Sequence, residues 1–177
     1  MKQISTDDLE AFKELKAGES VSLSGTIYTA RDAAHKRISE LIKGNKPLPF
    51  KMEGAVIYYA GPTPSKDGKA VGSCGPTTSS RMDKFAPQFY ELGMAAAIGK
   101  GDRDPKVAEA CGKFGGVYLC AIGGAGALCS KAIISSEVIA FEDLGCESVK
   151  KMTVKDFPLI VATDSTGEDI FEKRKLS

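Results

Sequence analysis

Short strand-like apolar segments alternate with helix-like ones along most of this chain, and this alternation is the feature that most restricts its fold. Segment 21–28 keeps apolar residues at every second position, whereas 34–42 keeps them at helical spacing. The alternation recurs in an apolar strand at 94–98, a helix over 104–111 that opens on Asp-Pro, and a strand at 117–122. Because alternating strands and helices build a sheet flanked by helices, the pattern predicts an α/β domain.

The last third of the chain is expected to be richer in strands. It carries apolar segments at 133–134, 138–141 and 159–163, and then a turn over 164–167. The polar residues 172–177 are expected to fray. Three elements complete the prediction: a helix over 9–15 capped by residues 5–8, a strand over 55–60, and a helix after Thr77. The length of 177 residues fits one domain over 1–177.

Charge and hydropathy exclude several classes of partner. Lys and Arg total 24 against 23 Asp and Glu, so the net charge of +1 gives no reason to expect a nucleic acid or a membrane surface. The longest apolar stretches, such as 56–60 and 94–98, are too short to span a bilayer. Residues 1–4 lack the apolar core of a signal peptide, so we expect a cytoplasmic protein.

The cysteines do not form a recognisable framework. Their number is odd and no Cys-x-x-Cys pair occurs, which argues against disulfides, a zinc ribbon or a self-contained iron–sulfur site. The five are Cys74, Cys111, Cys120, Cys129 and Cys146. Most are expected to be small buried side chains, with the loop residue Cys74 as the exception.

Residues 72–81 contain the densest group of unusual residues. Four consecutive hydroxyl residues, 77–80, precede Arg81. If Thr77 lies in the first turn of a helix, Arg81 falls on the same helix face, and such a helix start can hold a carboxylate or a phosphate. Hydroxyl residues also serve simply as helix caps, but four in succession exceed what capping requires.

Two further junctions carry cations. Lys100 stands between two glycines directly after a buried strand, where open α/β sheets place ligands, although a solvated turn lysine has the same appearance. Arg31 begins a helix, where the dipole disfavours positive charge; this suggests an anionic ligand, unless Asp32 merely neutralises it. His35, the only histidine, is more typical of a structural residue than of a catalyst. Together, Arg31, Arg81 and Lys100 beside hydroxyls suit a small dicarboxylate.

Four strings in this sequence resemble a known family. TARDAAHKR, GPTTSSRMD and IGKG, with DFPLIVATD near the end, are similar to the β subunit of iron–sulfur hydro-lyases, which include class I fumarate hydratase and L(+)-tartrate dehydratase. The match runs in order from about Val21 to Asp164, and Cys74 departs from the family pattern. The resemblance implies a swivelling β/β/α domain, similar to the small mobile domain of aconitase-like enzymes.

The same resemblance implies site residues and a partner. Arg31, Thr78, Arg81 and Lys100 would bind the substrate carboxylates, with Thr77 nearest the carbon-bound proton. Thr77, Arg81 and Lys100 are thus the expected catalytic residues, and no metal ligand is expected in this chain. A partner α subunit would carry three cysteine ligands to a four-iron four-sulfur cluster, and the two chains would form a hetero-oligomer.

The implied function is that of the β subunit of a fumarate hydratase, which interconverts fumarate and (S)-malate. An L(+)-tartrate dehydratase β subunit is the closest alternative, because the two substrates differ by one hydroxyl. A non-catalytic dicarboxylate-binding module that has lost its partner is a more distant one.

Overall fold

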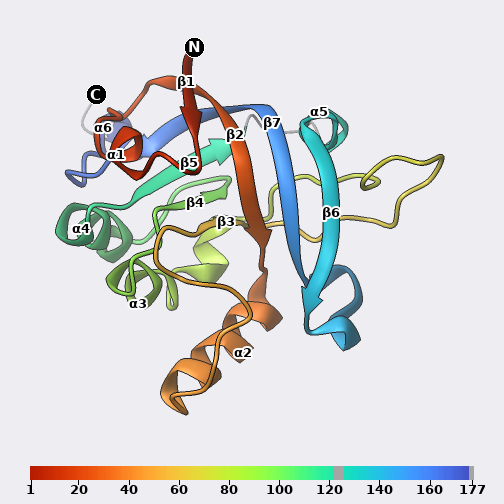
Figure 1. Ribbon diagram of the computed structural model, residues 1–177. Coiled ribbons are helices and arrows are strands. Elements are labelled where there is room, and N and C mark those ends of the chain that lie inside the picture. The colour runs from red at the N-terminus through yellow and green to blue at the C-terminus, as the bar shows by residue number, and fades with distance from the viewer. Residues whose placement is uncertain (122–125, 176–177) are drawn as a thin grey trace.

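A single mixed sheet organises the molecule (Figure 1). The structure, a computed structural model, describes residues 1–121 and 126–175. The strands are β1 (Lys2–Ser5), β2 (Ser20–Thr29), β3 (Val56–Tyr58), β4 (Ala96–Gly99), β5 (Val117–Ala121), β6 (Ile133–Ala140) and β7 (Val149–Thr163). Their order is β1-β2-β3-β4-β5-β7-β6, with β1 to β5 parallel to one another. The long β7 runs antiparallel to its neighbours.

The sheet closes on itself. One edge of β7 pairs with β2 from Ser20↔Ile160 to Tyr28↔Lys151, and the other edge pairs with β5 and β6. Strands β2, β3, β4, β5 and β7 therefore form a closed ring, which leaves no free edge among them.

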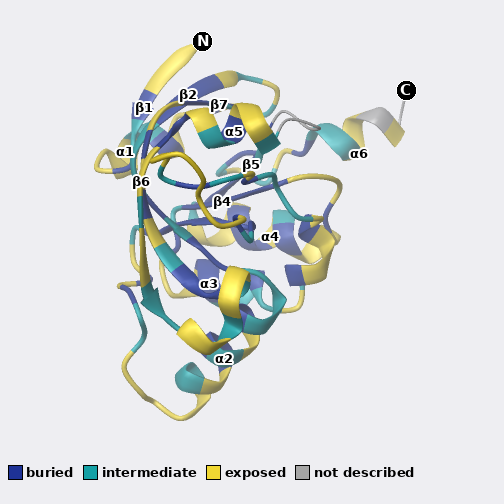
Figure 2. Ribbon diagram, turned by 90° about the vertical axis from the view of Figure 1, so that its right-hand side faces the viewer, coloured by how far each residue is buried: buried dark blue, intermediate teal, exposed yellow. Residues whose placement is uncertain are grey.

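Side chains alternate between two cores. Val56 and Tyr58 of β3 join a core built from all seven strands, and the ring of Tyr58 packs edge-on against Phe157 at 5.4 Å. Ile57 and Tyr59, which alternate with Val56 and Tyr58 along the chain, belong to a second core that also contains side chains of the helices. This alternation is the period-two geometry of a strand buried on both faces. In Figure 2 the central strands β4 and β5 carry buried residues, whereas the edge strand β6 and the outward faces of the helices are largely exposed.

The helices cover the outside of the barrel. They are α1 (Leu9–Lys13), α2 (Asp32–Lys43), α3 (Ala86–Glu91), α4 (Pro105–Phe114), α5 (Gly126–Lys131), α6 (Ile170–Lys175) and the 3₁₀ helices η1 (Ser79–Met82) and η2 (Glu142–Glu147). Helices α2, α3 and α4 lie on one side of the sheet (Figure 1). Asp8 caps α1 by accepting the Ala11 amide at 3.1 Å, and Asp104 caps α4 by accepting that of Lys106 at 2.9 Å.

The predicted α/β class is confirmed, as are the helices expected over 9–15, 34–42 and 104–111. The helix expected after Thr77 is present as the 3₁₀ helix η1, which begins at Ser79 and is followed by α3 at Ala86, so Thr77 does not lie in its first turn. The two strands expected at 133–134 and 138–141 are the single strand β6, and Phe141 lies beyond it. Strand β1 and helix α5 were not expected.

The expectation of a frayed C-terminus is wrong for residues 172–175, which belong to α6. Asp169 accepts the Phe171 amide at 2.7 Å, and the Lys175 ammonium lies 3.1 Å from the Asp102 carboxylate. Residues 122–125, the first of which ends an expected strand, and residues 176–177 lie outside the described residues. Within the described part of the chain, no helix is long and apolar enough to cross a membrane.

Candidate functional site

Two of the predicted site residues follow parallel strands of the sheet, with one strand between them. Arg31 comes two residues after β2, and Lys100 comes directly after β4. Backbone hydrogen bonds continue across this end of the sheet, from the Ala30 amide to the Tyr58 carbonyl at 3.1 Å and from the Tyr59 amide to the Ile98 carbonyl at 2.8 Å. Because β2, β3 and β4 are adjacent, their carboxyl ends bring these junctions to one edge of the barrel.

The hydroxyl segment is bound to the same edge. The Thr77 amide donates to the Tyr59 carbonyl at 2.6 Å, and Thr78 forms an isolated parallel bridge with Lys100. Ser79 extends the contact, because its amide donates to the Lys100 carbonyl at 3.0 Å. Thr77 and Thr78 are thus held as an extra strand-like segment beside Lys100, and Thr78, although it stands at the N-cap position of η1, makes no capping hydrogen bond with its side chain.

Ser79 has a structural role that its position among the hydroxyls did not indicate. It is fully buried, and its Oγ accepts the Lys100 amide at 3.0 Å and lies 2.9 Å from the Tyr118 hydroxyl. This contact requires glycine at position 99, because a Cβ on Gly99 would lie 1.9 Å from the Ser79 Oγ. The glycine before Lys100 therefore permits the hydroxyl segment to approach the strand end.

Arg81 reaches the start of α2 instead of lying on one helix face with Thr77. Its Nε lies 3.1 Å from Asp32 Oδ1 and its Nη2 lies 2.5 Å from Asp32 Oδ2, a two-point contact. The adjacent Arg31 lies 3.7 Å from the Glu147 carboxylate, and its buried Nε has no hydrogen-bond partner among the described residues. Two arginines with different carboxylate partners thus meet at the start of α2.

A buried arginine ties the loop after β4 to η1, and sequence reasoning did not find it. The Arg103 side chain is only 1% exposed, and its Nε lies 2.5 Å from Asp83 Oδ1. The second Asp83 oxygen accepts the Asp104 amide at 2.8 Å. The guanidinium carbon lies 5.2 Å from the centre of the Tyr59 ring and 4.7 Å from that of Tyr118. Arg103 therefore fixes the loop that begins at Lys100.

His35 is structural. It is fully buried, its Nδ1 donates to the Arg31 carbonyl at 2.9 Å, and its ring stacks on Phe89 with centroids 5.1 Å apart. Burial lowers its pKa from 6.5 to about 4, so the ring is neutral at neutral pH. A buried neutral imidazole packed among aromatic rings supports the helix that begins at Arg31 and has no access to a substrate.

The cysteines do not fit an iron–sulfur cluster. Cys74, Cys111 and Cys129 are buried, so Cys74 is not the exposed loop residue that was expected. Burial raises the pKa of the Cys74 and Cys111 thiols to about 12, which disfavours the thiolate that a cluster needs. Across residues 1–121 and 126–175, no three His, Cys, Asp or Glu side chains are grouped in a way that could hold a metal ion.

An open hollow beside Arg81 concentrates positive charge. It measures about 350 Å³ and is lined by Lys36, Arg81, Lys84, Asp32 and Glu147, among others. The hollow has three cations and two carboxylates, and both carboxylates already pair with Arg81 or Arg31. The surplus charge favours an anionic ligand.

Comparisons with known proteins agree with the sequence resemblance. The family model described as Fumarase C-terminus matches residues 1–174. "Fumarate hydratase 1, mitochondrial" of Leishmania major is 44% identical over 86% of this chain but only 28% of its own length. "Fumarate hydratase class I, aerobic" of Escherichia coli (strain K12) is 39% identical over 89% of this chain and 29% of its own length. The chain thus spans less than a third of the fumarate hydratases that it matches.

A second group of relatives has the length of this chain. The "Putative L(+)-tartrate dehydratase subunit beta" of Methanocaldococcus jannaschii is 41% identical, over 91% of this chain and 86% of its own length. The "L(+)-tartrate dehydratase subunit beta" of Escherichia coli (strain K12) is 34% identical over 99% and 89% respectively. With a family model over nearly its whole length and relatives of both kinds, the chain belongs to the Fumarase C-terminus family.

Proposed function

We propose that this chain is the β subunit of an iron–sulfur hydro-lyase of the fumarate hydratase type and supplies the substrate carboxylate clamp. The observation that carries the proposal is the bridge between Thr78 and Lys100 at the strand end where Arg31 also lies. Residues that are 22 positions or more apart in sequence converge there, and they include the motif residues of the family. The clamp consists of Arg31, Thr77, Thr78, Arg81 and Lys100.

The cations of the clamp suit the proposed reaction. Loss of water from a 2-hydroxy diacid needs removal of a weakly acidic proton from the carbon next to a carboxylate. Negative charge then develops on that carboxylate, and cations fixed beside it stabilise the transition state. Arg81 keeps an unoccupied guanidinium edge beyond its two contacts to Asp32, and this edge can bind a substrate carboxylate.

Thr77 is the residue of the clamp proposed to stand nearest the carbon-bound proton. Its backbone is fixed on Tyr59, but none of the described residues hydrogen-bonds to its hydroxyl. A threonine hydroxyl is a poor base at neutral pH, so a neighbouring group must accept the proton. We propose that this group comes from the partner subunit.

The partner is an α subunit that holds the four-iron four-sulfur cluster. This division is consistent with the burial of Cys74 and Cys111, whose raised pKa values keep both thiols protonated at neutral pH. We propose that the barrel is a swivelling β/β/α domain that carries the clamp toward the partner. The complex is then a hetero-oligomer in which neither chain is active alone.

Fumarate is the proposed substrate and L(+)-tartrate the second candidate. The second stays a candidate because two relatives named as tartrate dehydratase β subunits are 41% and 34% identical to this chain. The identities of 44% and 41% to the two kinds of relative do not separate them. The substrates differ by one hydroxyl, which the partner's half of the pocket can recognise.

The test is anaerobic co-expression with the α subunit and assay of both diacids with each chain alone and with the pair. Turnover of fumarate by the pair only is the expected result. A large preference for tartrate would replace the substrate assignment. Dicarboxylate binding by the isolated chain, without association or turnover, would favour the non-catalytic module.

Arg81→Lys tests the clamp within that complex. Lysine cannot make the two-point contact, and loss of a charge-assisted hydrogen bond of roughly 1.5–3 kcal/mol lowers kcat/KM about 10- to 150-fold. Arg37→Lys is the matched control, because Arg37 contacts Asp143 through two nitrogens at 2.8 and 2.5 Å outside the clamp. Equal turnover in both variants would remove Arg81 from the site.

A further inference from the structure

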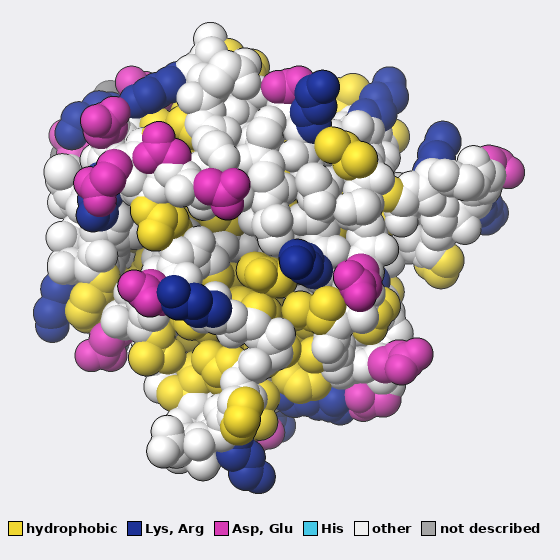
Figure 3. Space-filling model, viewed as in Figure 1, with side chains coloured by type: hydrophobic (Ala, Val, Ile, Leu, Met, Phe, Trp, Pro, Cys, Tyr) yellow, Lys and Arg dark blue, Asp and Glu magenta, His cyan; other side chains and the backbone are white. Residues whose placement is uncertain are grey.

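Residues 61–73 form an arm that projects from the barrel between β3 and the clamp. Residues 63–69 are all exposed, and Figures 1 and 3 show the arm extending well beyond the rest of the molecule. Its base is nevertheless ordered by hydrogen bonds. The Thr63 amide donates to the Ser73 carbonyl at 2.9 Å, and the Gly72 amide donates to the Thr63 carbonyl at 3.0 Å. The arm is therefore anchored at its base, where Val71 is buried in the first core, while its outer residues 63–69 are exposed.

Beside the arm lies an unusual group of exposed apolar side chains. Among the described residues seven large apolar side chains are exposed, and three of these lie on the adjacent elements α5 and β6. Leu128 and Ile134 are each 58% exposed and Val138 is 47% exposed. Ile134 lies at an irregularity of β6, where the pairing with β7 shifts between Ile133 and Ser135, and Val138 lies four residues further along the same strand. Such clustering marks an interaction site more often than single exposed residues do.

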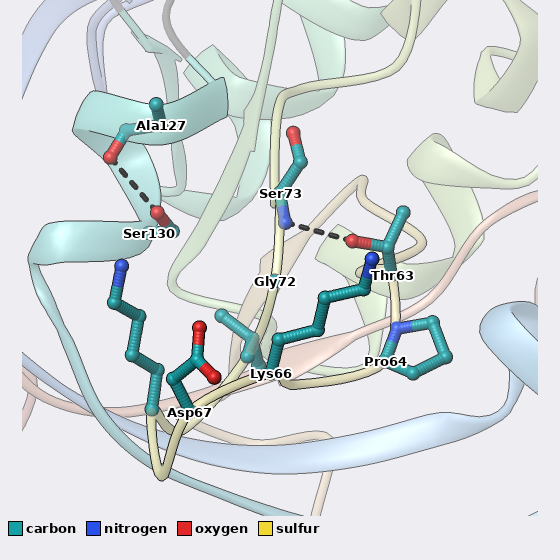
Figure 4. A pocket seen from close by; sticks show the side chains of 10 residues that line it. Thr63, Pro64, Lys66, Asp67, Gly72, Ser73, Ala127 and Ser130 are labelled. Atoms are coloured by element: carbon teal, nitrogen blue, oxygen red, sulfur yellow. Dashed lines mark hydrogen bonds between the residues drawn. The ribbon is translucent and has the colours of Figure 1, made fainter.

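Strand β6 also ends the sheet. Within the described part of the chain it pairs with β7 alone, so its other edge is open to a partner. A hollow of about 380 Å³ separates this strand from the arm and is lined by Pro62, Pro64 and Val71 on one side and by Ser136 and Val138 on the other, among others. Figure 4 shows a second hollow, of about 450 Å³, between the arm residues Thr63, Lys66 and Asp67 and the α5 residues Ala127 and Ser130.

The arm and β6, the two segments that border these hollows, are both followed in sequence by residues at the clamp. The arm continues into Thr77 and Thr78, and β6 continues into η2, where Glu147 contacts Arg31 at 3.7 Å. Lys150 holds η2 in place, because its ammonium lies 3.2 Å from the Cys146 carbonyl and 2.8 Å from the Ser148 hydroxyl. A protein seated here would thus touch the two segments that position the clamp.

We propose that residues 61–73 together with Leu128, Ile134 and Val138, the arm–β6 face, dock the cluster-bearing α subunit. The inference rests on the proposed function and specifies the surface through which it operates. The matched fumarate hydratases have more than two thirds of their length outside this module. That remainder must approach the clamp closely, because both parts act on the same small substrate. The arm–β6 face groups exposed apolar side chains beside the two segments that lead into the clamp residues.

Charge adds a requirement for the partner. The arm and the adjacent end of α5 carry Lys66, Lys69 and Lys131 against Asp67, a surplus of positive charge on this side of the face, whereas β6 itself carries the exposed Glu137. The complementary surface of the α subunit is therefore apolar at its centre and acidic where it meets the arm.

The experiment compares two pairs of substitutions in the full chain co-expressed with a tagged α subunit. The test variant is Ile134→Glu with Val138→Glu. The control is Leu92→Glu with Phe114→Glu, which charges two apolar residues that are 41% and 38% exposed away from this face. The dissociation constant of purified subunits is expected to rise at least 10-fold in the test variant and less than 2-fold in the control, with circular dichroism of each chain unchanged.

A second variant keeps the test decisive if the two introduced glutamates unfold β6. Replacing residues 64–70 by a short glycine–serine turn removes only arm residues and is expected to weaken association to a similar degree. Unchanged association of either folded variant overturns the proposed face while the hydro-lyase assignment stands. Failure of the wild-type chains to associate overturns both. A homodimer of this chain that the test variant dissociates would assign the face to a second copy and overturn the proposal.

Discussion

Lowering the pH below 6.5 is expected to destabilise this protein through its single histidine. His35 is fully buried in the native state, with a pKa of about 4 against 6.5 for the free side chain. Desolvation is the main cause, and the hydrogen bond from Nδ1 to the Arg31 carbonyl opposes it. The ring stacks on Phe89 and meets Tyr59 edge-on, so the native state cannot hydrate a charged imidazole.

The sign and size of this change in the free energy of unfolding follow from proton linkage. Above pH 6.5 the ring is neutral in both states, and the stability is unaffected. Between pH 6.5 and about 4 the unfolded chain binds a proton that the folded chain does not, so the free energy of unfolding falls by up to about 1.4 kcal/mol per pH unit. Over the whole window the loss amounts to roughly 3 kcal/mol, a large part of the stability of a small domain.

Urea unfolding of the isolated chain at intervals from pH 7.5 to 4.5 measures this loss. The control is His35→Gln, which keeps a polar side chain of related size but does not titrate. Its stability at neutral pH is lower, but its slope between pH 6.5 and 4.5 is expected to be flatter than that of the wild type by about one proton. Parallel pH profiles of the two proteins would refute the assignment of a buried, neutral His35.

Three other substitutions test the contacts that support the clamp. Gly99→Ala places a Cβ 1.9 Å from a buried hydroxyl oxygen, and thermal unfolding should show a loss of about 1–3 kcal/mol; an unchanged midpoint would contradict the close approach. Arg103→Met leaves the partly buried Asp83 without its cation, so denaturant unfolding should show a loss of about 3–5 kcal/mol, and a loss below 1 kcal/mol would argue against the pair. Asp32→Asn loosens Arg81 and should raise KM about 10-fold with a smaller effect on kcat in the complex, whereas a lower KM would mean that Asp32 competes with the substrate.

The sequence pattern predicted the elements that rest on local periodicity. Strand 21–28 and helix 34–42 have unambiguous apolar spacing, and β2 and α2 cover them. The convergence of Arg31 and Lys100 also follows from simple topology, because the carboxyl ends of neighbouring parallel strands lie together. The proposed roles of these residues came from the family resemblance and remain predictions.

The hydroxyl segment shows where local reasoning failed. Thr77 and Thr78 have the composition of a helix start, yet their backbone partners are Tyr59 and Lys100, 18 and 22 residues away. Capping rules consider only the next few residues, so they cannot anticipate a bridge to another strand end. The one sequence signal was Gly99 before Lys100, which makes room for Ser79.

No local sequence pattern indicated the buried ion pair between Arg103 and Asp83. Both residues stand in polar loop sequences that predict solvated side chains, and only the fold places the guanidinium near the rings of Tyr59 and Tyr118. The C-terminus is similar: residues 172–175 are polar, but the capping contact of Asp169 and the ion pair between Lys175 and Asp102 stabilise a helix there. Contacts between distant segments overrule composition in both cases.

The way in which the clamp is held bears on how two subunits can share one reaction. Lys100 is fixed through backbone hydrogen bonds to Ser79, and Arg81 through two contacts to Asp32, all within this chain. Much of the entropy of ordering these cations is therefore lost when the chain folds, before the partner binds. Association then has only to bring an already arranged set of charges to the substrate, since preorganised groups need no rearrangement as charge develops. In the proposed swivelling arrangement, a barrel that carries a rigid clamp would open for substrate exchange and close again without rebuilding the site, whereas a clamp divided between flexible loops would have to be reordered at every turnover.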